Sequence, residues 1–204
     1  MLVREVMTPD PVTVRADTTV KAALALLDEH SITLLPVLSP AGLIVGVVGE
    51  ADLIRDAVHP DARASLLPTR PEPMGPPPHM VSEVMNPRTL TVHGDTDLAD
   101  AADLMTGTTV KSLPVVDDHH HVVGMVSRRD IVRVLARSDG VVEQEVDALF
   151  HDLGVDWLAE VRDGVVTVTG PADAKDRALA RTVASTVPGV VAVTITDEPG
   201  SARQ

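Results

Sequence analysis

The segment Ser127-Arg128-Arg129-Asp130 combines side chains that could bind an oxygen-rich anion. We expect Asp130 to lie at the start of a helix, where the helix dipole also favours an anion. Its carboxylate can accept hydrogen bonds from ligand hydroxyls, and Ser127 adds a hydroxyl. The guanidinium groups of Arg128 and Arg129 are candidate phosphate partners. Ser-x-x-Asp is equally a near match to a helix capping box, and the two roles are compatible.

This segment has a counterpart 78 residues earlier in the chain, at Gly49-Glu50-Ala51-Asp52. Other blocks recur at the same offset: Val6–Pro9 with Val84–Pro87, Leu35–Val37 with Leu113–Val115, and Val45–Val48 with Val123–Val126. Matches in one unbroken register indicate a tandem duplication. The first copy keeps the aspartate but has Gly49 where the second has a hydroxyl, and Glu50 would repel a phosphate. We therefore predict a weaker site around Asp52.

Each copy is expected to contain a short strand, an amphipathic helix, a β-hairpin and a closing helix. In the first copy these are strand Val12–Val14, a helix opening at Asp17–Val20 with Thr18 as its cap, strands Leu34–Leu38 and Ile44–Val48 around the turn Ser39–Gly42, and a helix from about Asp52. In the second copy they are strand Thr89–Val92, a helix opening at Asp95–Leu98 with Thr96 as its cap, strands Leu113–Val116 and Val122–Val126 around the turn Asp117–His120, and a helix from about Asp130.

Between the copies lies the segment Pro60–Pro78, which holds seven of the 16 prolines and is expected to be an extended linker. After Ser138 the pattern changes to helix, hairpin, helix and strand. The expected elements are a helix at Val142–Leu153, strands Trp157–Arg162 and Val165–Thr169 turned by Asp163-Gly164, a helix at Ala172–Thr186 and a strand at Val190–Thr196.

The composition of the 204 residues excludes several functions. The chain has no cysteine, which removes disulfides, thiolate catalysis and Cys-based zinc sites. A net charge of −13 repels a nucleic-acid backbone, and one Trp, one Phe and no Tyr give no base-stacking platform. No signal peptide and no membrane-spanning run is visible, which predicts a soluble cytoplasmic protein. The sequence contains no recognisable pair of nucleophile and base, so we do not expect an enzyme. His119-His120-His121 is interpreted as a solvated turn, not a metal site.

The repeated motifs resemble the cystathionine β-synthase (CBS) domain: Met-x-Pro, then Leu-Pro-Val, then Gly followed by an aspartate before the last helix. Two copies resemble a CBS pair, or Bateman module, over about Met1–Ser138. The resemblance implies an α+β fold in which two β-α-β-β-α units pair about a pseudo-twofold axis. It predicts a first CBS motif at residues 1–59, a linker at 60–79 and a second CBS motif at 80–138.

The same resemblance implies a regulatory ligand that contains adenosine, namely AMP, ADP or ATP, with S-adenosylmethionine also possible and no cofactor required. Asp130 would receive the ribose hydroxyls, and aliphatic Val12 and Ile32 would flank the adenine. The implied binding residues are Val12, Ile32, Thr33, Met125, Ser127, Arg128, Arg129 and Asp130. The implied second, weaker cleft contains Asp52, Arg88, Leu90, Val110 and Lys111. The alternatives are core positions for Val12 and Ile32, and a solvated surface lysine for Lys111.

Residues 141–198 resemble a second kind of domain, the BON domain, with a tail at 199–204. The resemblance rests on the segments Val161–Gly170, Arg177-Ala178 and Pro188–Val193, and implies a small α-β-β-α-β unit. Because the surface is acidic, we expect a protein-interaction or output module and not membrane contact. The predicted protein is a homodimeric sensor built on CBS pairs, with an unknown protein partner. The alternatives are a ligand-free structural or dimerisation module and a DNA-associated regulator, which would need a basic face.

Overall fold

The computed structural model describes residues 1–55 and 77–196, so nearly all of the expected linker and the tail 199–204 lie outside the described residues. The chain forms two compact units. Unit 1 consists of Met1–Val6, Asp95–Lys111 and the chain from Ser127 onward, and unit 2 consists of Met7–Gly94 and Ser112–Val126. No helix within residues 1–55 and 77–196 is long and apolar enough to cross a membrane.

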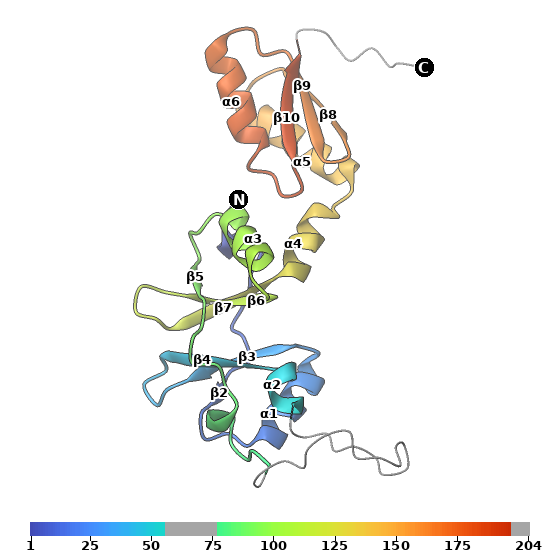
Figure 1. Cartoon of the computed structure of the whole chain (residues 1–204). Coiled ribbons are helices and arrows are strands. Elements are labelled where there is room, and N and C mark those ends of the chain that lie inside the picture. The colour runs from blue at the N-terminus through green and yellow to red at the C-terminus, as the bar shows by residue number, and fades with distance from the viewer. Residues whose placement is uncertain (56–76, 197–204) are drawn as a thin grey trace, which may run out of the picture. The chain divides into compact units, whose positions relative to one another are not determined.

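The first sheet of unit 2 has the strand order β2-β3-β4. Its elements are β2 (Val14–Arg15), α1 (Val20–His30), β3 (Leu34–Leu38), β4 (Ile44–Gly49) and α2 (Glu50–Ile54) (Figure 1). β3 pairs in parallel with β2 and in antiparallel with β4. Apolar side chains of these strands and helices form one core together with Val81: Val14, Ala23, Leu27, Leu35, Val37, Val48 and Leu53.

The second sheet has the order β1-β7-β6-β5. Its strands are β1 (Thr8–Pro9), β5 (Val92–His93), β6 (Ser112–Val116) and β7 (Val122–Ser127). The two hairpins lie where the sequence predicts them, but the first strand of each copy was predicted too early and too long. The observed β2 and β5 keep only the last expected residue and one more, because each pairs with only two residues of its neighbour. The Met-x-Pro segment of the first copy contributes the strand β1.

The Met-x-Pro segments cross between the two copies. β1 of the first copy pairs with β7 of the second, with Pro9 opposite Gly124. In return, Asn86 of the second copy exchanges two backbone hydrogen bonds with Val47 of the first, at 2.8 and 3.0 Å. Each crossing passes over a glycine, Gly124 or Gly46, whose missing side chain leaves room for the other copy's Met-x-Pro segment. The repeated Val-Gly motif is therefore a docking point for the repeated Met-x-Pro motif.

The turns at the start of each copy cross in the same way. Within unit 1, η1 (Val3–Glu5) lies at the start of α3 (Leu98–Gly107), where Val3 N–H donates to Thr96 O at 2.9 Å. Within unit 2, η2 (Val81–Glu83) lies at the start of α1, where Val81 N–H donates to Thr18 O at 2.8 Å. Each copy therefore completes the helix start of the other copy.

The helix caps lie one residue after the expected threonines. Thr19 caps α1 by accepting a hydrogen bond from Ala22 N–H at 3.2 Å. Asp97 caps α3 by accepting from Ala99 N–H at 2.9 Å. The prediction of Thr18 was wrong because its hydroxyl accepts from Arg15 N–H and closes the preceding turn.

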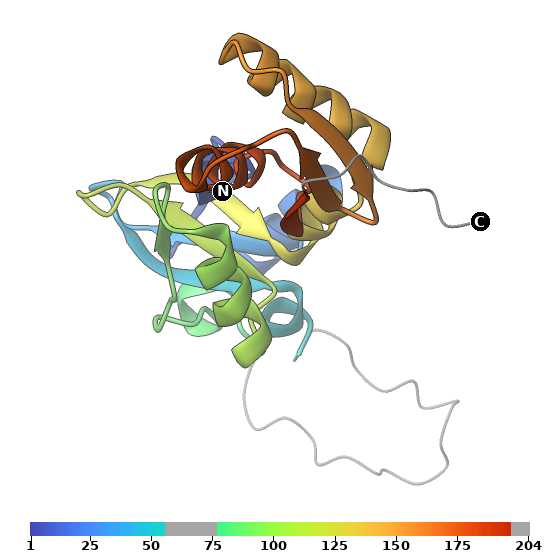
Figure 2. The same cartoon turned by 90° about the horizontal axis from the view of Figure 1, so that it is seen from above.

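The C-terminal part of unit 1 packs two helices against a three-stranded sheet (Figures 1 and 2). Its elements are α5 (Asp139–Asp152), β8 (Leu158–Arg162), β9 (Val165–Thr169), α6 (Ala174–Ala184) and β10 (Ala192–Thr196), in the sheet order β10-β9-β8. Asp163 and Gly164 both have positive φ, as a tight hairpin turn requires. Phe150 and Trp157 meet edge to face at 5.3 Å in the core of this domain.

This C-terminal domain is fastened to the end of α4 (Arg128–Leu135). The guanidinium of Arg137, just after α4, donates to Pro188 O at 2.7 Å and forms a two-pronged ion pair with Glu145 of α5. Gly189, at φ +100°, lies so close to Val142 of α5 that an added methyl would be 3.0 Å from its side chain. The C-terminal domain is therefore attached to α4 by side-chain contacts as well as by the short connection between α4 and α5.

Substituting the two crossing glycines by alanine should destabilise the protein. A methyl at Gly46 would lie 2.9 Å from the backbone oxygen of Asn86, whereas one at Gly124 would chiefly meet the flexible side chain of Met7. We expect Gly46→Ala to cost about 1–3 kcal/mol of unfolding free energy, and Gly124→Ala less. Chemical denaturation measures these variants. Gly107→Ala is the control, because outside its own helix backbone and chain neighbours the added methyl would meet no atom within 4 Å. Equal stability of Gly46→Ala and the parent chain would contradict the crossing.

The Arg137–Glu145 pair predicts a pH dependence. The hydrogen bonds from Arg137 hold the pKa of Glu145 below its ordinary value. The pair should therefore stabilise the domain above the ordinary carboxyl pKa and stop doing so as pH falls through the lowered one. Fluorescence of the single tryptophan, Trp157, reports unfolding of this domain. Glu145→Gln should lower the unfolding free energy of this domain at neutral pH by less than about 1 kcal/mol, since the Arg137–Glu145 pair is partly exposed. A difference that persists at acid pH would contradict this.

Candidate functional site

The carboxylate of Asp130 is the one buried charged group in the described part of the chain, with only 7% of the residue exposed. It lies in the first turn of α4. Oδ2 accepts hydrogen bonds from Ser127 N–H at 2.9 Å and from the Ser127 hydroxyl at 2.6 Å. Oδ1 accepts from Arg133 Nη1 at 3.1 Å. The backbone contact is one half of a capping box, so the structural role expected for this motif is present.

The Ser127 hydroxyl donates its only hydrogen bond to Asp130, because an ionised carboxylate can only accept. The serine oxygen is then an acceptor toward any ligand, and it cannot donate to a phosphate while this bond persists. The observed geometry therefore gives Ser127 a positioning role for the Asp130 carboxylate.

The two arginines of the motif differ in what they contact. The Arg128 guanidinium donates to Met105 O and Thr108 O at the end of α3, where it satisfies carbonyls that the helix leaves unpaired. Arg129 is exposed, and within the described residues its side chain makes no hydrogen bond or ion pair. Of the two, Arg129 is the guanidinium available to a ligand.

The first copy repeats the carboxylate geometry without the hydroxyl. Asp52 Oδ2 accepts from Gly49 N–H at 3.1 Å, and Oδ1 accepts from Arg55 Nη2 at 3.4 Å. Its side chain is 28% exposed, against 9% for Asp130. Asp52 is therefore held by fewer and longer contacts than Asp130.

The residues at the start of each hairpin lie beside the closing helix of their own copy. Lys111 O accepts from Arg128 N–H at 3.0 Å, and Thr33 O accepts from Glu50 N–H at 3.1 Å. The resemblance to CBS domains instead implies one cleft that contains Lys111 with Asp52 and another that contains Thr33 with Asp130. The Lys111 side chain is exposed, and within the described residues no hydrogen bond or ion pair holds it.

The other predicted binding residues have ordinary surroundings. Val12, Ile32 and Met125 belong to unit 2 and are half-buried, and Val12 and Ile32 pack against its core. Because Asp130 belongs to unit 1, their shared cleft stays a prediction. In the predicted second cleft, Arg88 and Leu90 are exposed and Val110 is half-buried. Arg88 uses its backbone N–H to bond Asn86 Oδ1 at 2.9 Å.

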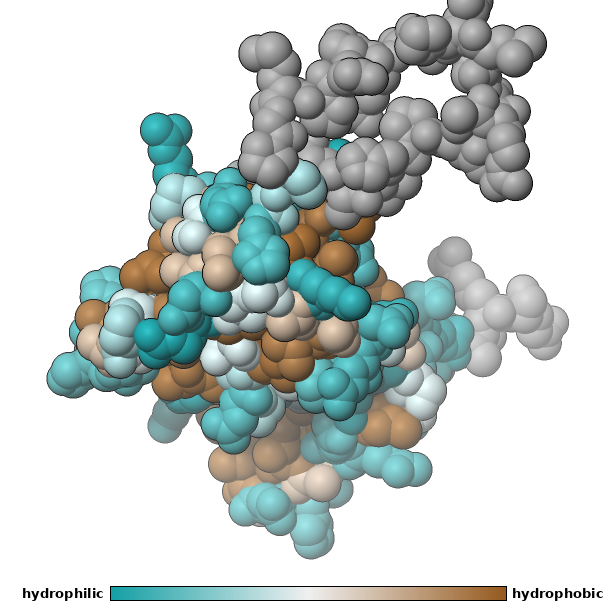
Figure 3. Space-filling model, turned by 90° about the horizontal axis from the view of Figure 1, so that it is seen from below, coloured by the Kyte–Doolittle hydropathy of each residue, from teal (hydrophilic) through white to brown (hydrophobic). Residues whose placement is uncertain are grey.

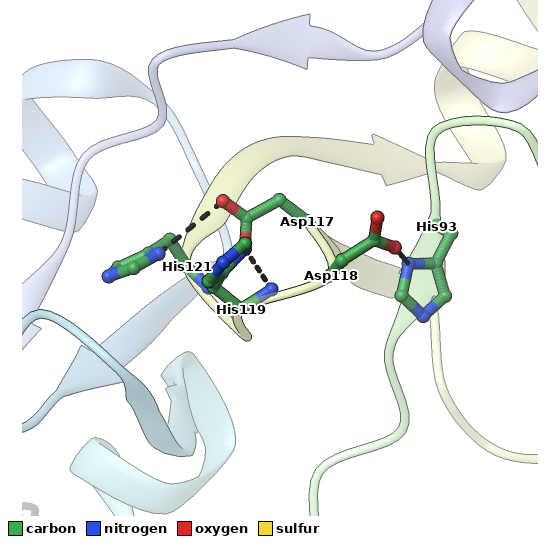
Figure 4. Close-up of polar contacts among 5 residues, drawn as sticks. All are labelled: His93, Asp117, Asp118, His119 and His121. Carbon is green, nitrogen blue, oxygen red and sulfur yellow. Dashed lines mark hydrogen bonds and ion pairs between the residues drawn. The ribbon is translucent and has the colours of Figure 1, made fainter.

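The histidine-rich turn between β6 and β7 is organised by Asp117 (Figure 4). Its Oδ1 accepts from the backbone N–H groups of His121 at 2.8 Å and His119 at 2.9 Å. The backbone N–H of His121 is the largest cause of the lowered pKa of Asp117. His93 faces Asp118 at 4.0 Å. Nowhere in residues 1–55 and 77–196 do three or more His, Asp or Glu side chains gather in a way that could hold a metal ion.

None of the predicted site residues lines a cavity of about 490 Å³ in unit 2. Its polar lining comes from Thr13, Arg15, Thr18 and Ser39, and Arg15 is paired with Asp17 at 3.2 Å. On the face shown in Figure 3, apolar side chains form several groups separated by hydrophilic ones. Scattered exposed apolar residues are ordinary for a protein surface. We assign no ligand to these features.

The chain matches the CBS domain family over residues 3–59 and 81–137. A CBS domain-containing protein of Dictyostelium discoideum is 32% identical over 137 residues, which cover 67% of this chain and 92% of that protein. These matches span more than half of the chain and both of its copies. The protein belongs to the CBS domain family, and its first two thirds form a tandem CBS pair.

Solved CBS pairs have the same fold. CBSX2 in complex with AMP is 33% identical, with a TM-score of 0.53, over 65% of this chain and 93% of that one. CBSX2 comes from Arabidopsis thaliana. A CBS domain pair in complex with 5′-methylthioadenosine and S-adenosyl-L-methionine is 25% identical, with a TM-score of 0.54, over 66% and 98% of the two chains. Curated relatives also include enzymes, such as an inosine-5′-monophosphate dehydrogenase of Methanocaldococcus jannaschii, 29% identical over 63% of this chain and 22% of its own length.

Removing the aspartate from either copy should destabilise the protein, because each carboxylate caps a helix. We expect Asp52→Ala to cost about 0.5–1 kcal/mol and Asp130→Ala about 1–2 kcal/mol, since Asp130 has an additional bond to the Ser127 hydroxyl. Urea denaturation of the two variants measures the difference. If Asp130→Ala proved as stable as the parent chain, the capping role would be refuted.

Proposed function

We propose that this protein is a regulatory sensor that binds one adenosine-containing ligand, such as AMP, ADP or ATP, at the CBS motif of the second copy. The observation that carries the proposal is the buried Asp130 carboxylate at the start of α4, fixed by the Ser127 N–H and hydroxyl. A rigid acceptor of this kind suits the vicinal hydroxyls of a ribose. The neighbours bound to AMP, to 5′-methylthioadenosine and to S-adenosyl-L-methionine support this class of ligand.

The phosphate end of the ligand would be bound by side chains that have no other partner among residues 1–55 and 77–196. Arg129 and Lys111 are both exposed, and the bond from Arg128 N–H to Lys111 O places Lys111 beside the helix that carries Asp130. We therefore assign Lys111 to the Asp130 site. Arg128 is assigned to the structure of α3 and α4, because its guanidinium already contacts two carbonyls. The adenine would lie between aliphatic side chains.

The first copy is proposed to bind weakly or not at all. Gly49 offers no hydroxyl to fix Asp52, and Glu50 brings a negative charge beside the place where a phosphate would lie. The larger exposed fraction of Asp52 also reduces the strength of any hydrogen bond that it makes, since water competes for it.

The C-terminal domain is proposed to be a BON-like output or interaction module. Its helix-strand-strand-helix-strand order fits that family, and the Arg137 contacts fasten it to the end of the helix that begins at Asp130. A shift of α4 on ligand binding would therefore move this domain with it. The proposed protein acts in the cytoplasm as a homodimer through its CBS pairs, has an unidentified protein partner, and performs no catalysis.

One observation favours the second candidate, a CBS pair that serves only structure or dimerisation. Both oxygens of Asp130 already have partners within the chain, so the carboxylate is satisfied without a ligand. That module would be a stable dimer in light scattering and would respond to no nucleotide.

A thermal-shift titration with AMP, ADP, ATP and S-adenosylmethionine tests the sensor. A ligand at 100 times its Kd should stabilise the protein by about 2.7 kcal/mol. Asp130→Ala should abolish the shift because it removes the ribose acceptor, and Asp52→Ala should leave it in place. No shift with any of the four compounds would count against the sensor, and the reverse order of the two variants would refute the assignment to the second copy.

The first copy should gain binding when it is given the side chains of the second. Gly49 has φ −108° and ψ 169°, which a serine adopts readily, and its added Cβ would be 3.4 Å from the nearest atom, Thr33 O. We expect Gly49→Ser with Glu50→Arg to raise the AMP binding stoichiometry in calorimetry above that of the parent chain. Gly49→Ser alone is the control for the hydroxyl. An unchanged stoichiometry in the double variant would show that these two positions do not explain the difference between the copies.

A further inference from the structure

Arg133 donates a hydrogen bond to Oδ1, the oxygen of the Asp130 carboxylate that a ligand could still use. A carboxylate offers roughly four acceptor positions, two on each oxygen. On Oδ2, the Ser127 N–H and hydroxyl occupy both, at 2.9 and 2.6 Å. On Oδ1, Arg133 Nη1 occupies one at 3.1 Å. One position is left on Oδ1, whereas the two vicinal hydroxyls of a ribose need two.

The contacts to Asp130 differ in how easily they can be released. The Ser127 contacts come from the residue that caps α4, and the backbone part of the contact cannot leave without unwinding the helix start. The Arg133 side chain is 70% exposed, so its guanidinium can turn into water at little cost. Arg133 is therefore the partner that would give way to a ribose.

The same arrangement occurs in both copies. Arg55 stands three residues after Asp52, as Arg133 stands three residues after Asp130, and each donates to Oδ1 of its aspartate. In the first copy the distance is 3.4 Å and the arginine is 67% exposed. The duplicated chain thus carries a matched control for any experiment on Arg133.

We propose that Arg133 sets the ligand affinity of the Asp130 site by competing with the ribose hydroxyls for Oδ1. The inference rests on the proposed function, and it goes beyond that function by naming the residue that competes with the ligand for Asp130. Arg133 is a regulatory competitor: it satisfies the buried carboxylate when no ligand is bound, and binding must first displace it.

The competition predicts a specific chemical signature. Arg133→Met keeps the length and apolar stem of the side chain but cannot donate to Oδ1. An exposed pair of this kind is worth up to about 1 kcal/mol, so adenosine should bind about two- to fivefold more tightly to this variant. Adenosine is the probe because it has both ribose hydroxyls and no phosphate on which an arginine could act. The analogue 2′,3′-dideoxyadenosine lacks both hydroxyls, so its affinity should not change.

The experiment is calorimetry of the full chain with these two nucleosides. Arg133→Gln, which keeps a neutral donor, should give an intermediate gain, and Arg55→Met should give none. A melting curve of each variant checks folding. The inference is overturned if Arg133→Met leaves adenosine affinity unchanged or weakens it, or if it tightens both nucleosides equally. If Arg55→Met gives the gain in its place, the ribose lies on Asp52. If neither the parent chain nor any variant binds adenosine, the proposed function itself fails, and the inference fails with it.

Discussion

The CBS pair depends on the exchange of segments between its two copies. The strand β1 of the first copy pairs across Gly124 of the second, and Asn86 of the second copy bonds to Val47 across Gly46 of the first. The turns η1 and η2 cross in the same sense to the helix starts of the opposite copies. Neither copy is complete alone, which explains why the Met-x-Pro and Val-Gly motifs recur together at one offset. The same interdependence means that a change at one crossing acts on both copies.

Within this symmetric frame the two copies differ in a few atoms. Both aspartates accept from the backbone at the start of a helix, and both receive an arginine on Oδ1. Only the second copy adds a hydroxyl, and only there is the carboxylate nearly inaccessible to water. A single substitution, serine against glycine at the cap, thus gives the Asp130 carboxylate a hydrogen bond that the Asp52 carboxylate lacks. Duplication supplies two similar helix starts, and this substitution makes them unequal.

The sequence predicted the order of elements and both hairpins, because alternating apolar residues and turn residues determine those locally. It failed where pairing with a distant segment decides. The length of β2 depends on Val37 and Leu38, and the Met-x-Pro segment became a strand through its distant partner Gly124. The Ser-x-x-Asp spacing predicted the capping contact between Ser127 and Asp130, whereas the contact of Arg133 with Asp130 was missed. Its signal, an arginine three residues after each aspartate, was present in both copies.

We propose that one ligand binds per chain, at the second copy. Native mass spectrometry of the purified protein titrated with AMP measures this directly, since it counts bound ligands on each assembly. We expect one AMP per chain in the parent protein and none in Asp130→Ala. Two equally tight AMP molecules per chain, or no AMP on the parent protein at any concentration, would contradict binding at the second copy alone.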